Sequence, residues 1–237
     1  MTWRRGLWTA GMTWRRGLWK RLLYVRFLLW QRHRYGRLVL ERVNGRPLLV
    51  LPEVFNPALF ASGALLAREI SRRGELLPPG SRVLDLGTGS GIGAIAAAGR
   101  AQAVVASDIN PQAVRCARIN VLLNQVEQRV EVRCGDLFAP LRPGERFDVV
   151  LFNPPYYRGQ PRSPLDQAWR SLDVIERFAC DLPAALAPGG WGLVVLSSDG
   201  ERAAFLQAFR TQGLSYELVA GQDLLNETLS VYRVRVA

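Results

Sequence analysis

A short apolar strand that runs directly into a glycine-rich turn constrains this chain more than any other feature. Residues 83–93 read VLDLGTGSGIG, in which the apolar run ends at Leu86 and glycine then occupies every second position. Such a run is typical of a buried strand, and glycine lets the backbone approach a ligand closely. The helix expected over residues 94–98 directs its free N–H groups at the same place. The segment therefore predicts a ligand-binding strand–turn–helix unit of an α/β domain.

Two carboxylates accompany this turn. Asp85 precedes the first glycine, and Asp108 ends a second apolar strand expected over residues 104–106. The turn is similar to the G-x-G-x-x-G pattern that also serves dinucleotides, and an acid at the end of the second strand is where such folds hold a ribose. A carboxylate can accept hydrogen bonds from both ribose hydroxyls. Asp108 is therefore predicted to bind a ribose, the alternative being an ordinary polar strand end.

A later strand ends in a rigid turn that is rich in acceptors. The strand is expected over residues 147–152, and Asn153-Pro154-Pro155-Tyr156 follows it. Two prolines fix two φ angles and remove two backbone donors. The Asn153 side-chain oxygen and the Pro154 carbonyl can then accept both hydrogens of a planar N–H2 group, and Tyr156 is expected to stack its ring on that group. The alternative is a purely structural Pro-Pro turn.

Together these motifs resemble the class I S-adenosylmethionine (SAM) methyltransferases. The closest resemblance is to the short form of the HemK-type protein-(glutamine-N5) methyltransferases, and it covers the chain from about residue 50 to the end. Four runs carry this resemblance: Val54-Phe55-Asn56-Pro57, Asp108-Ile109-Asn110-Pro111, Gly135-Asp136-Leu137-Phe138 and Asn153-Pro154-Pro155-Tyr156.

The resemblance implies a fold, a cofactor and a set of site residues. The implied fold is α/β, a Rossmann-like methyltransferase with a seven-stranded, mostly parallel sheet in the order 3-2-1-4-5-7-6 and helices on both faces. SAM is the implied cofactor, with Asp85 near its amino group and Asp136 near its adenine. The implied catalytic residues are Asn153, Pro154, Pro155 and Tyr156. The implied cofactor contacts are Asp85, Gly87, Thr88, Gly89, Gly91, Asp108, Ile109, Asp136, Leu137 and Asn153.

The methyl acceptor is less constrained than the cofactor. The resemblance implies a glutamine of a protein substrate, as in the Gly-Gly-Gln loop of peptide-chain release factors. Adenine-N6 methylation of RNA or DNA uses the same acceptor geometry and stays open as the alternative, although a paired base must first be flipped out. A third hypothesis is a SAM-binding protein without turnover that is tethered to a membrane or a ribosome.

No metal is expected at the site. Positioning can supply most of the acceleration of a methyl transfer from a sulfonium. The single histidine, His33, lies far from the motifs, and Cys116, Cys134 and Cys180 show no metal-ligand spacing. Three scattered thiols favour a reducing, cytoplasmic location.

The net charge of +11 is concentrated at the N-terminus. Residues 1–40 hold ten basic and no acidic residues, which leaves 21 basic and 20 acidic residues for the rest of the chain. A nearly neutral catalytic domain does not support a broad basic cleft for duplex DNA or folded RNA. Total charge does not exclude a local patch.

The N-terminal segment is a Trp- and Arg-rich extension that repeats itself. MTWRRGLW occurs at residues 1–8 and again at 12–19, and apolar residues then recur at helical spacing. This pattern predicts a basic amphipathic helix suited to an anionic membrane surface or to RNA, the alternative being a tail that docks on the domain. Arg26 interrupts an apolar run that is too short to span a membrane, and the segment is a poor signal peptide.

The remaining patterns divide the chain into an extension (1–37), a hairpin and lead-in helix (38–79) and a SAM-binding catalytic domain (80–237). Asn44-Gly45 predicts the hairpin turn between strands at residues 38–43 and 48–51. Further helices are expected at about residues 58–73, 111–123, 165–186 and 201–211. Further strands are expected at about residues 130–133, 191–196, 215–219 and 229–236.

Overall fold

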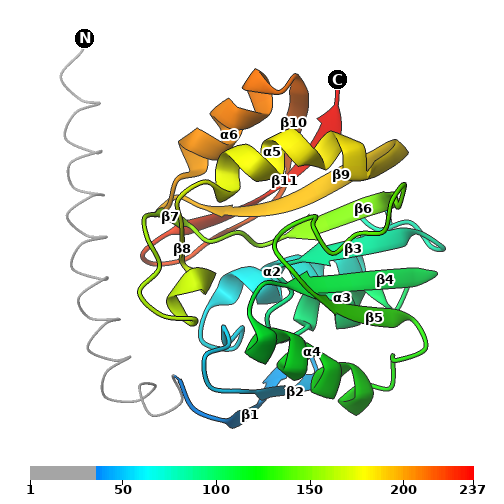
Figure 1. Ribbon diagram of the computed structural model, residues 1–237, viewed down its shortest axis with the longest axis vertical. Coiled ribbons are helices and arrows are strands. Elements are labelled where there is room, and N and C mark those ends of the chain that lie inside the picture. Colours follow the sequence, from blue (N-terminus) through cyan, green and yellow to red (C-terminus); the bar gives the residue numbers. More distant parts are fainter. Residues whose placement is uncertain (1–35) are drawn as a thin grey trace.

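The structure, a computed structural model, describes residues 36–237 and contains one seven-stranded sheet with helices on both faces (Figure 1). The sheet has the order β10-β11-β9-β6-β3-β4-β5. Read from β5, and with β3 as the first strand of the domain, this is the expected order 3-2-1-4-5-7-6. The predicted fold is therefore confirmed. The predictions for residues 1–35, including the amphipathic helix, lie outside the described residues.

Most strands of the sheet are parallel, and the exception lies at one edge. The strands β3, β4, β5, β6 and β9 run parallel to one another, whereas β11 is antiparallel to β9 and to β10. The parallel strands are β3 (Arg82–Leu86), β4 (Ala103–Asp108), β5 (Val130–Cys134), β6 (Phe147–Phe152) and β9 (Leu186–Ser197). The antiparallel pair is β10 (Leu214–Asp223) and β11 (Thr228–Val236).

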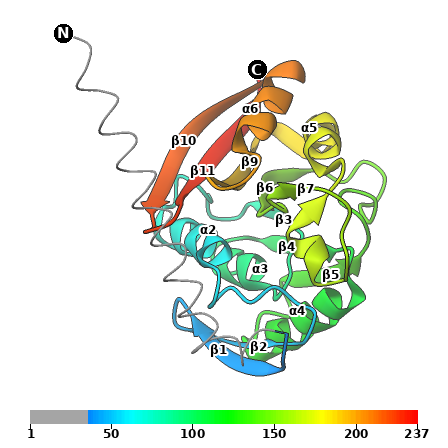
Figure 2. The same cartoon turned by 90° about the vertical axis from the view of Figure 1, so that its left-hand side faces the viewer.

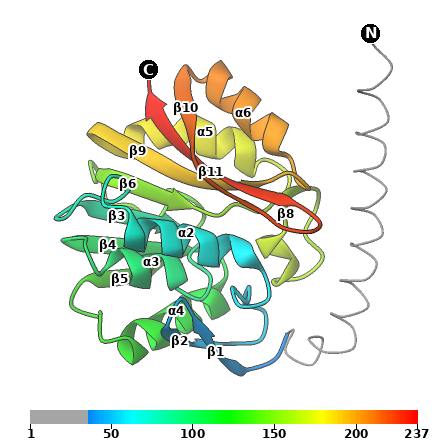
Figure 3. The same cartoon turned by 180° about the vertical axis from the view of Figure 1, so that it is seen from behind.

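Helices cover the two faces in separate groups. The face seen in Figure 3 carries α2 (Ala61–Arg72), α3 (Ile92–Ala97) and α4 (Pro111–Leu123), and the opposite face carries α5 (Val174–Ala185) and α6 (Arg202–Thr211). Successive residues of the central strand β6 enter different cores: Val149 packs with α2 and α3, and Val150 packs with α5 and α6. Because both faces are buried, the strand reads as a continuous apolar run.

The N-terminal hairpin, β1 (Val39–Val43) and β2 (Arg46–Val50), lies against α4 and outside the main sheet (Figure 2). Its turn is the predicted Asn44-Gly45, with positive φ at both residues. Asn120 of α4 is fully buried, and its side chain forms two hydrogen bonds with the backbone of Leu49 in β2. The Asn120 side-chain oxygen accepts from the Leu49 amide at 2.7 Å, and its nitrogen donates to the Leu49 carbonyl at 2.8 Å. The same amide nitrogen donates to the Ser90 carbonyl at 2.8 Å. The hairpin is therefore tied to the glycine-rich turn.

The helix expected over residues 165–186 is wrong in its first half. The structure has a short 3-10 helix, η3 (Asp166–Ala168), then β8 (Arg170–Ser171), and the α-helix begins only at Val174. The residues of β8 pair instead with β7 (Tyr157–Arg158), which follows the Asn-Pro-Pro-Tyr turn. This tertiary pairing competes with helix formation. The strand expected over residues 191–196 begins earlier, because residues 186–190 already belong to β9. No helix of the described residues is long and apolar enough to cross a membrane.

Candidate functional site

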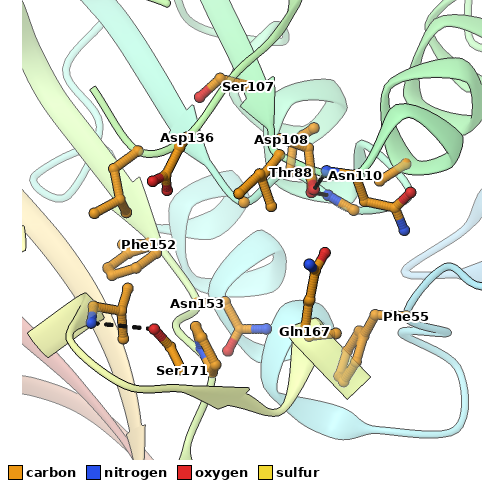
Figure 4. Close-up of a pocket in the computed structure, with 18 of the residues that line it drawn as sticks. Phe55, Thr88, Ser107, Asp108, Asn110, Asp136, Phe152, Asn153, Gln167 and Ser171 are labelled. Atoms are coloured by element: carbon orange, nitrogen blue, oxygen red, sulfur yellow. Dashed lines mark hydrogen bonds between the residues drawn. The ribbon is translucent and has the colours of Figure 1, made fainter. Parts of the chain in front are cut away.

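A cavity of about 360 Å³ lies at the carboxyl ends of β3, β4, β5 and β6 (Figure 4). This edge is where open α/β sheets bind ligands. The cavity is lined by most of the residues predicted from the sequence. These are Asp85, Gly87, Thr88, Gly89, Asp108, Ile109, Asp136, Leu137, Asn153 and Pro155.

The glycine-rich turn is held by the buried carboxylate of Asp85. One oxygen of this carboxylate accepts from the Thr88 hydroxyl at 2.6 Å and from the Ala94 amide at 2.8 Å. Gly93 is required beside it, because a Cβ there would lie 2.6 Å from the other carboxylate oxygen. Gly91 has a φ of 85° where α3 begins, a conformation that glycine adopts without strain. Burial raises the pKa of Asp85 to about 6. Asp85 therefore clamps the turn while it lines the cavity.

Asp108 is positioned at the end of β4 with its carboxylate at the cavity. One oxygen accepts from the Gly89 amide at 2.9 Å, and the other accepts from the Asn110 amide at 2.9 Å. Burial raises the pKa of this carboxyl above its usual value. Each oxygen keeps a further lone pair, so two acceptors remain side by side on the cavity wall. This geometry suits a vicinal diol.

Asp136 and Leu137 form the wall beyond β5. Leu137 has a φ of 44°, which is rare for a residue with a branched side chain. Asp136 forms an ion pair with Arg177 of α5 at 2.6 Å, and both residues line the cavity. Sequence reasoning placed Asp136 near an adenine but missed Arg177. Nothing in the spacing of a residue on a later helix could have identified that partner.

Asn153 follows β6 directly and lines the cavity from the side opposite Asp108 (Figure 4). Pro155 lines the cavity beside it, whereas Pro154 and Gly91, which were also predicted, are not among the lining residues. The expected stacking role of Tyr156 is not what the structure shows, since its side chain is only 8% exposed and is not among the cavity-lining residues. Instead, the Tyr156 hydroxyl donates to the Asn153 side-chain oxygen at 2.7 Å. The reason is packing by the residues after β9, since a Cβ at Gly200 would lie only 2.8 Å from the Tyr156 Cβ.

We call residues 157–171 the cover segment, because they form a further wall of the cavity between β7 and β8. An aromatic cluster fixes this segment to the residues that precede α2. The Trp169 ring centroid lies 5.0 Å from that of Phe55 and 4.5 Å from that of Phe60. The Tyr157 amide also donates to the Trp169 carbonyl at 2.8 Å. Gln160, Pro161 and Pro164 of this segment line the cavity.

The cover segment also contributes a residue that sequence reasoning missed. Gln167, on η3, lines the cavity, and its carboxamide points into it from below Thr88 and Asp108 (Figure 4). The predicted helix over this stretch gave no reason to single it out.

Metal ligands are absent from the described part of the chain. No group of three or more His, Cys, Asp or Glu side chains within residues 36–237 could hold a metal ion. Cys116 donates to the Leu49 carbonyl at 3.1 Å, and burial raises the pKa of its thiol to about 11. This thiol is therefore a poor nucleophile at neutral pH.

Sequence comparison identifies relatives over most of the described residues. Residues 47–215 match the methyltransferase small domain family. A putative protein N5-glutamine methyltransferase of Methanocaldococcus jannaschii is 29% identical over 80% of this chain and 95% of its own length. A release factor glutamine methyltransferase of Koribacter versatilis is 34% identical over 63% of this chain and 57% of its own. A ribosomal protein L11 methyltransferase of Chloroflexus aurantiacus is 41% identical over 59% and 45% of the two chains.

Coverage differs among these relatives. The chain spans 57%, 39% and 45% of three curated relatives that it matches, which include a ribosomal protein uL3 glutamine methyltransferase of Bradyrhizobium diazoefficiens. Among solved structures, one similar fold is a 16S rRNA N2 G1207 methyltransferase of Thermus thermophilus in complex with AdoMet and guanosine. The TM-score is 0.65 at 21% sequence identity, and the match covers 85% of this chain and 50% of that chain. A ribosomal protein L11 methylase of Lactobacillus delbrueckii has a TM-score of 0.57 at 20% identity, over 76% and 80%. At such identities the likeness shows the fold.

Proposed function

The chain belongs to the methyltransferase small domain family, and on that premise we propose that it transfers a methyl group from SAM to the side-chain nitrogen of a glutamine in a protein substrate. The observation that carries the proposal is the meeting, in one cavity, of the Asp108 carboxylate with Asn153 and Pro155 of the Asn-Pro-Pro-Tyr turn. Relatives named as glutamine methyltransferases support it, including one that the chain matches over nearly its whole length.

The cavity residues fit a nucleoside-bearing cofactor. Asp108 offers two adjacent acceptor oxygens for the ribose hydroxyls. Ile109 and Leu137 supply apolar walls for a flat base, and the Asp136 carboxylate lies beside them to accept from an exocyclic amine. Asp85 contributes a negative charge for the amino group at the glycine-rich turn. When bound, SAM supplies an electrophilic methyl group on a sulfonium whose leaving form is neutral.

The acceptor side of the site is built from Asn153 and Pro154. The Asn153 oxygen and the Pro154 carbonyl accept the two hydrogens of the acceptor's N–H2 group and hold its nitrogen toward the cofactor. As positive charge develops on that nitrogen, both oxygens stabilise it, so their contribution is larger in the transition state than in the ground state. The nitrogen's proton then passes to solvent, and no side-chain base is required.

The charge distribution favours a protein over a nucleic acid as the substrate. Beyond residue 40 the chain carries 21 basic and 20 acidic residues. The arginines among the described cavity-lining residues are paired: Arg177 with Asp136 at 2.6 Å and Arg170 with Asp166 at 3.6 Å. Phosphate binding draws on unpaired cations. Adenine-N6 methylation of RNA or DNA is therefore the second candidate.

The test is to incubate the full chain with methyl-labelled SAM and a panel of acceptors. The panel contains a peptide-chain release factor, ribosomal proteins, total RNA and DNA, and each labelled product is mapped by mass spectrometry. We expect label on a glutamine of a protein. Asn153→Ala should remove most turnover while SAM affinity stays close to that of the unmodified protein, because Asn153 acts on the acceptor. Label confined to adenine would contradict the proposal, and label on protein amines would replace glutamine with lysine or an α-amino group.

A further inference from the structure

The buried hydroxyl of Tyr156 determines which way the Asn153 carboxamide faces. A carboxamide carries an acceptor oxygen on one side and a donor N–H2 on the other, and only the oxygen can receive an acceptor's N–H. The Tyr156 hydroxyl donates to that oxygen at 2.7 Å. If the carboxamide rotated by half a turn, its N–H2 would replace the oxygen at this contact. The hydroxyl hydrogen would then lose this acceptor, and the hydroxyl would have to turn and accept from the N–H2 instead.

The backbone of Tyr156 is itself fixed by contacts with other segments of the chain. The Glu201 amide donates to the Tyr156 carbonyl at 2.9 Å, and Gly200 packs so closely that a Cβ there would lie 2.6 Å from that carbonyl oxygen. The next residue, Tyr157, begins the cover segment, and its amide donates to the Trp169 carbonyl at 2.8 Å. The turn between β9 and α6 and the cover segment together fix the backbone on both sides of the ring. The position of the hydroxyl is therefore set by structure outside the Asn-Pro-Pro-Tyr turn.

The hydroxyl also stays protonated across the physiological pH range. The ring is only 8% exposed, and burial raises the pKa of Tyr156 well above its usual range, with the nearby Ser62 hydroxyl offsetting only part of the shift. A protonated phenol supplies a donor hydrogen to the carbonyl oxygen of Asn153. This oxygen has two lone pairs, so one is taken by Tyr156 and one is left for the acceptor.

We propose that Tyr156 is a positioning residue that locks the Asn153 carboxamide with its oxygen toward the methyl acceptor. The inference rests on the proposed role of Asn153 in holding an N–H2 group. It assigns Tyr156 to the rear of the site, where it acts through Asn153, in place of a ring that stacks on the acceptor. The two roles make opposite demands: the lock needs the hydroxyl, and stacking needs only the ring.

Kinetics of Tyr156→Phe separate these roles. The phenylalanine variant keeps the ring and loses one oxygen, so the lock predicts that kcat falls by about tenfold, as for one lost hydrogen bond in the transition state. The acceptor KM and the SAM affinity should each stay within about twofold, because uniform binding is untouched. The matched control is Tyr157→Phe, because Tyr157 is 36% exposed and is not among the cavity-lining residues; this variant should leave kcat unchanged. A Tyr156→Phe enzyme with full kcat would overturn the proposal.

A second measurement requires no acceptor. In the ¹⁵N-labelled full chain, the side-chain N–H2 signals of Asn153 are identified as the pair missing from Asn153→Ala. We expect Tyr156→Phe to move this pair toward the positions of exposed asparagines and to raise its hydrogen-exchange rate by about tenfold. An unchanged pair would overturn the proposal. If release factor and ribosomal proteins are not methylated by the unmodified enzyme, the glutamine proposal fails, and this measurement still decides the role of Tyr156.

Discussion

Asp108 carries one backbone donor on each carboxylate oxygen, and this arrangement fixes the direction of its remaining lone pairs. The two donors come from the glycine-rich turn and from the start of α4, so the carboxylate also joins these two elements. A side chain with both roles is rigid before any ligand arrives. That rigidity lowers the entropy cost of binding a diol.

The first prediction at this scale concerns cofactor affinity. Asp108→Ala should weaken SAM binding by about 1–3 kcal/mol, because charge-assisted hydrogen bonds to the ribose are lost. Titration calorimetry measures it. Asp108→Asn is the control, because it keeps the shape and one acceptor oxygen and should lose less. Equal affinity in all three proteins would remove Asp108 from the ribose role.

A second prediction follows from the pKa of Asp85, which burial raises to about 6. Above this pH the carboxyl is ionised and attracts the positively charged amino group of SAM; below it the carboxyl is neutral. Affinity for SAM should therefore rise with pH, and at about pH 5 it should be about tenfold weaker than at neutral pH. Calorimetry across this range checks the slope. In Asp85→Asn the same titration should be nearly flat, and an equally steep curve there would assign the effect to another group.

Residue identities in the site were predictable to different degrees. Asp108 and Asn153 end strands, and the ends of parallel strands meet at one edge, so sequence order alone places them together. The hydroxyl of Tyr156 and the pairing of Asp136 with Arg177 were not predictable, because both depend on contacts with elements far along the chain. A local pattern carries no information on such contacts.

At the scale of elements, the cover segment shows why one helix was misplaced. Residues 165–171 have adequate helical character, but β7–β8 pairing and the packing of Trp169 on Phe55 and Phe60 stabilise a different path. By contrast, β6 was predicted with its bounds, because a strand buried on both faces leaves a continuous apolar signal. Elements that are stabilised by their own periodicity are predictable, and those that are stabilised by distant partners are not.

The third prediction concerns this aromatic cluster. Trp169→Ala should loosen the cover segment, and trypsin should then cleave at Arg158, Arg162 and Arg170 about tenfold faster, since proteolysis follows the population of the open form. Mass spectrometry of the fragments locates the cuts. Trp169→Phe retains a ring against Phe55 and Phe60 and should be cleaved at an intermediate rate. Cleavage of Trp169→Ala at the original rate would show that the cluster does not hold the segment.

At the scale of the whole molecule, charge and fold are separated along the sequence. The ten basic residues of the first 40 positions account for nearly all of the net charge of +11. The cavity, the cover segment and the hairpin that supports the glycine-rich turn all lie within residues 36–237. The proposed methyl transfer to a protein glutamine relies on these described residues, whereas an RNA substrate would draw its phosphate contacts from the basic extension.

The last prediction uses this separation. A chain that starts at Leu38 lacks ten positive charges and retains all of the cavity-lining residues that the structure describes. If a glutamine is the acceptor, this shortened enzyme should methylate a release factor at about the rate of the full chain. If RNA is the acceptor, its binding should weaken sharply and lose most of its salt dependence, because each lost phosphate contact removes about one unit from the slope of log affinity against log salt.

The decisive measurement is therefore the salt slope of RNA binding together with the methylation rate, each determined for both chains. Loss of release-factor activity with the extension would contradict the glutamine proposal in its present form, since the extension would then carry part of the recognition. An unchanged salt slope for RNA would instead exclude the extension as a nucleic-acid contact and leave a membrane surface as the partner to test with anionic vesicles.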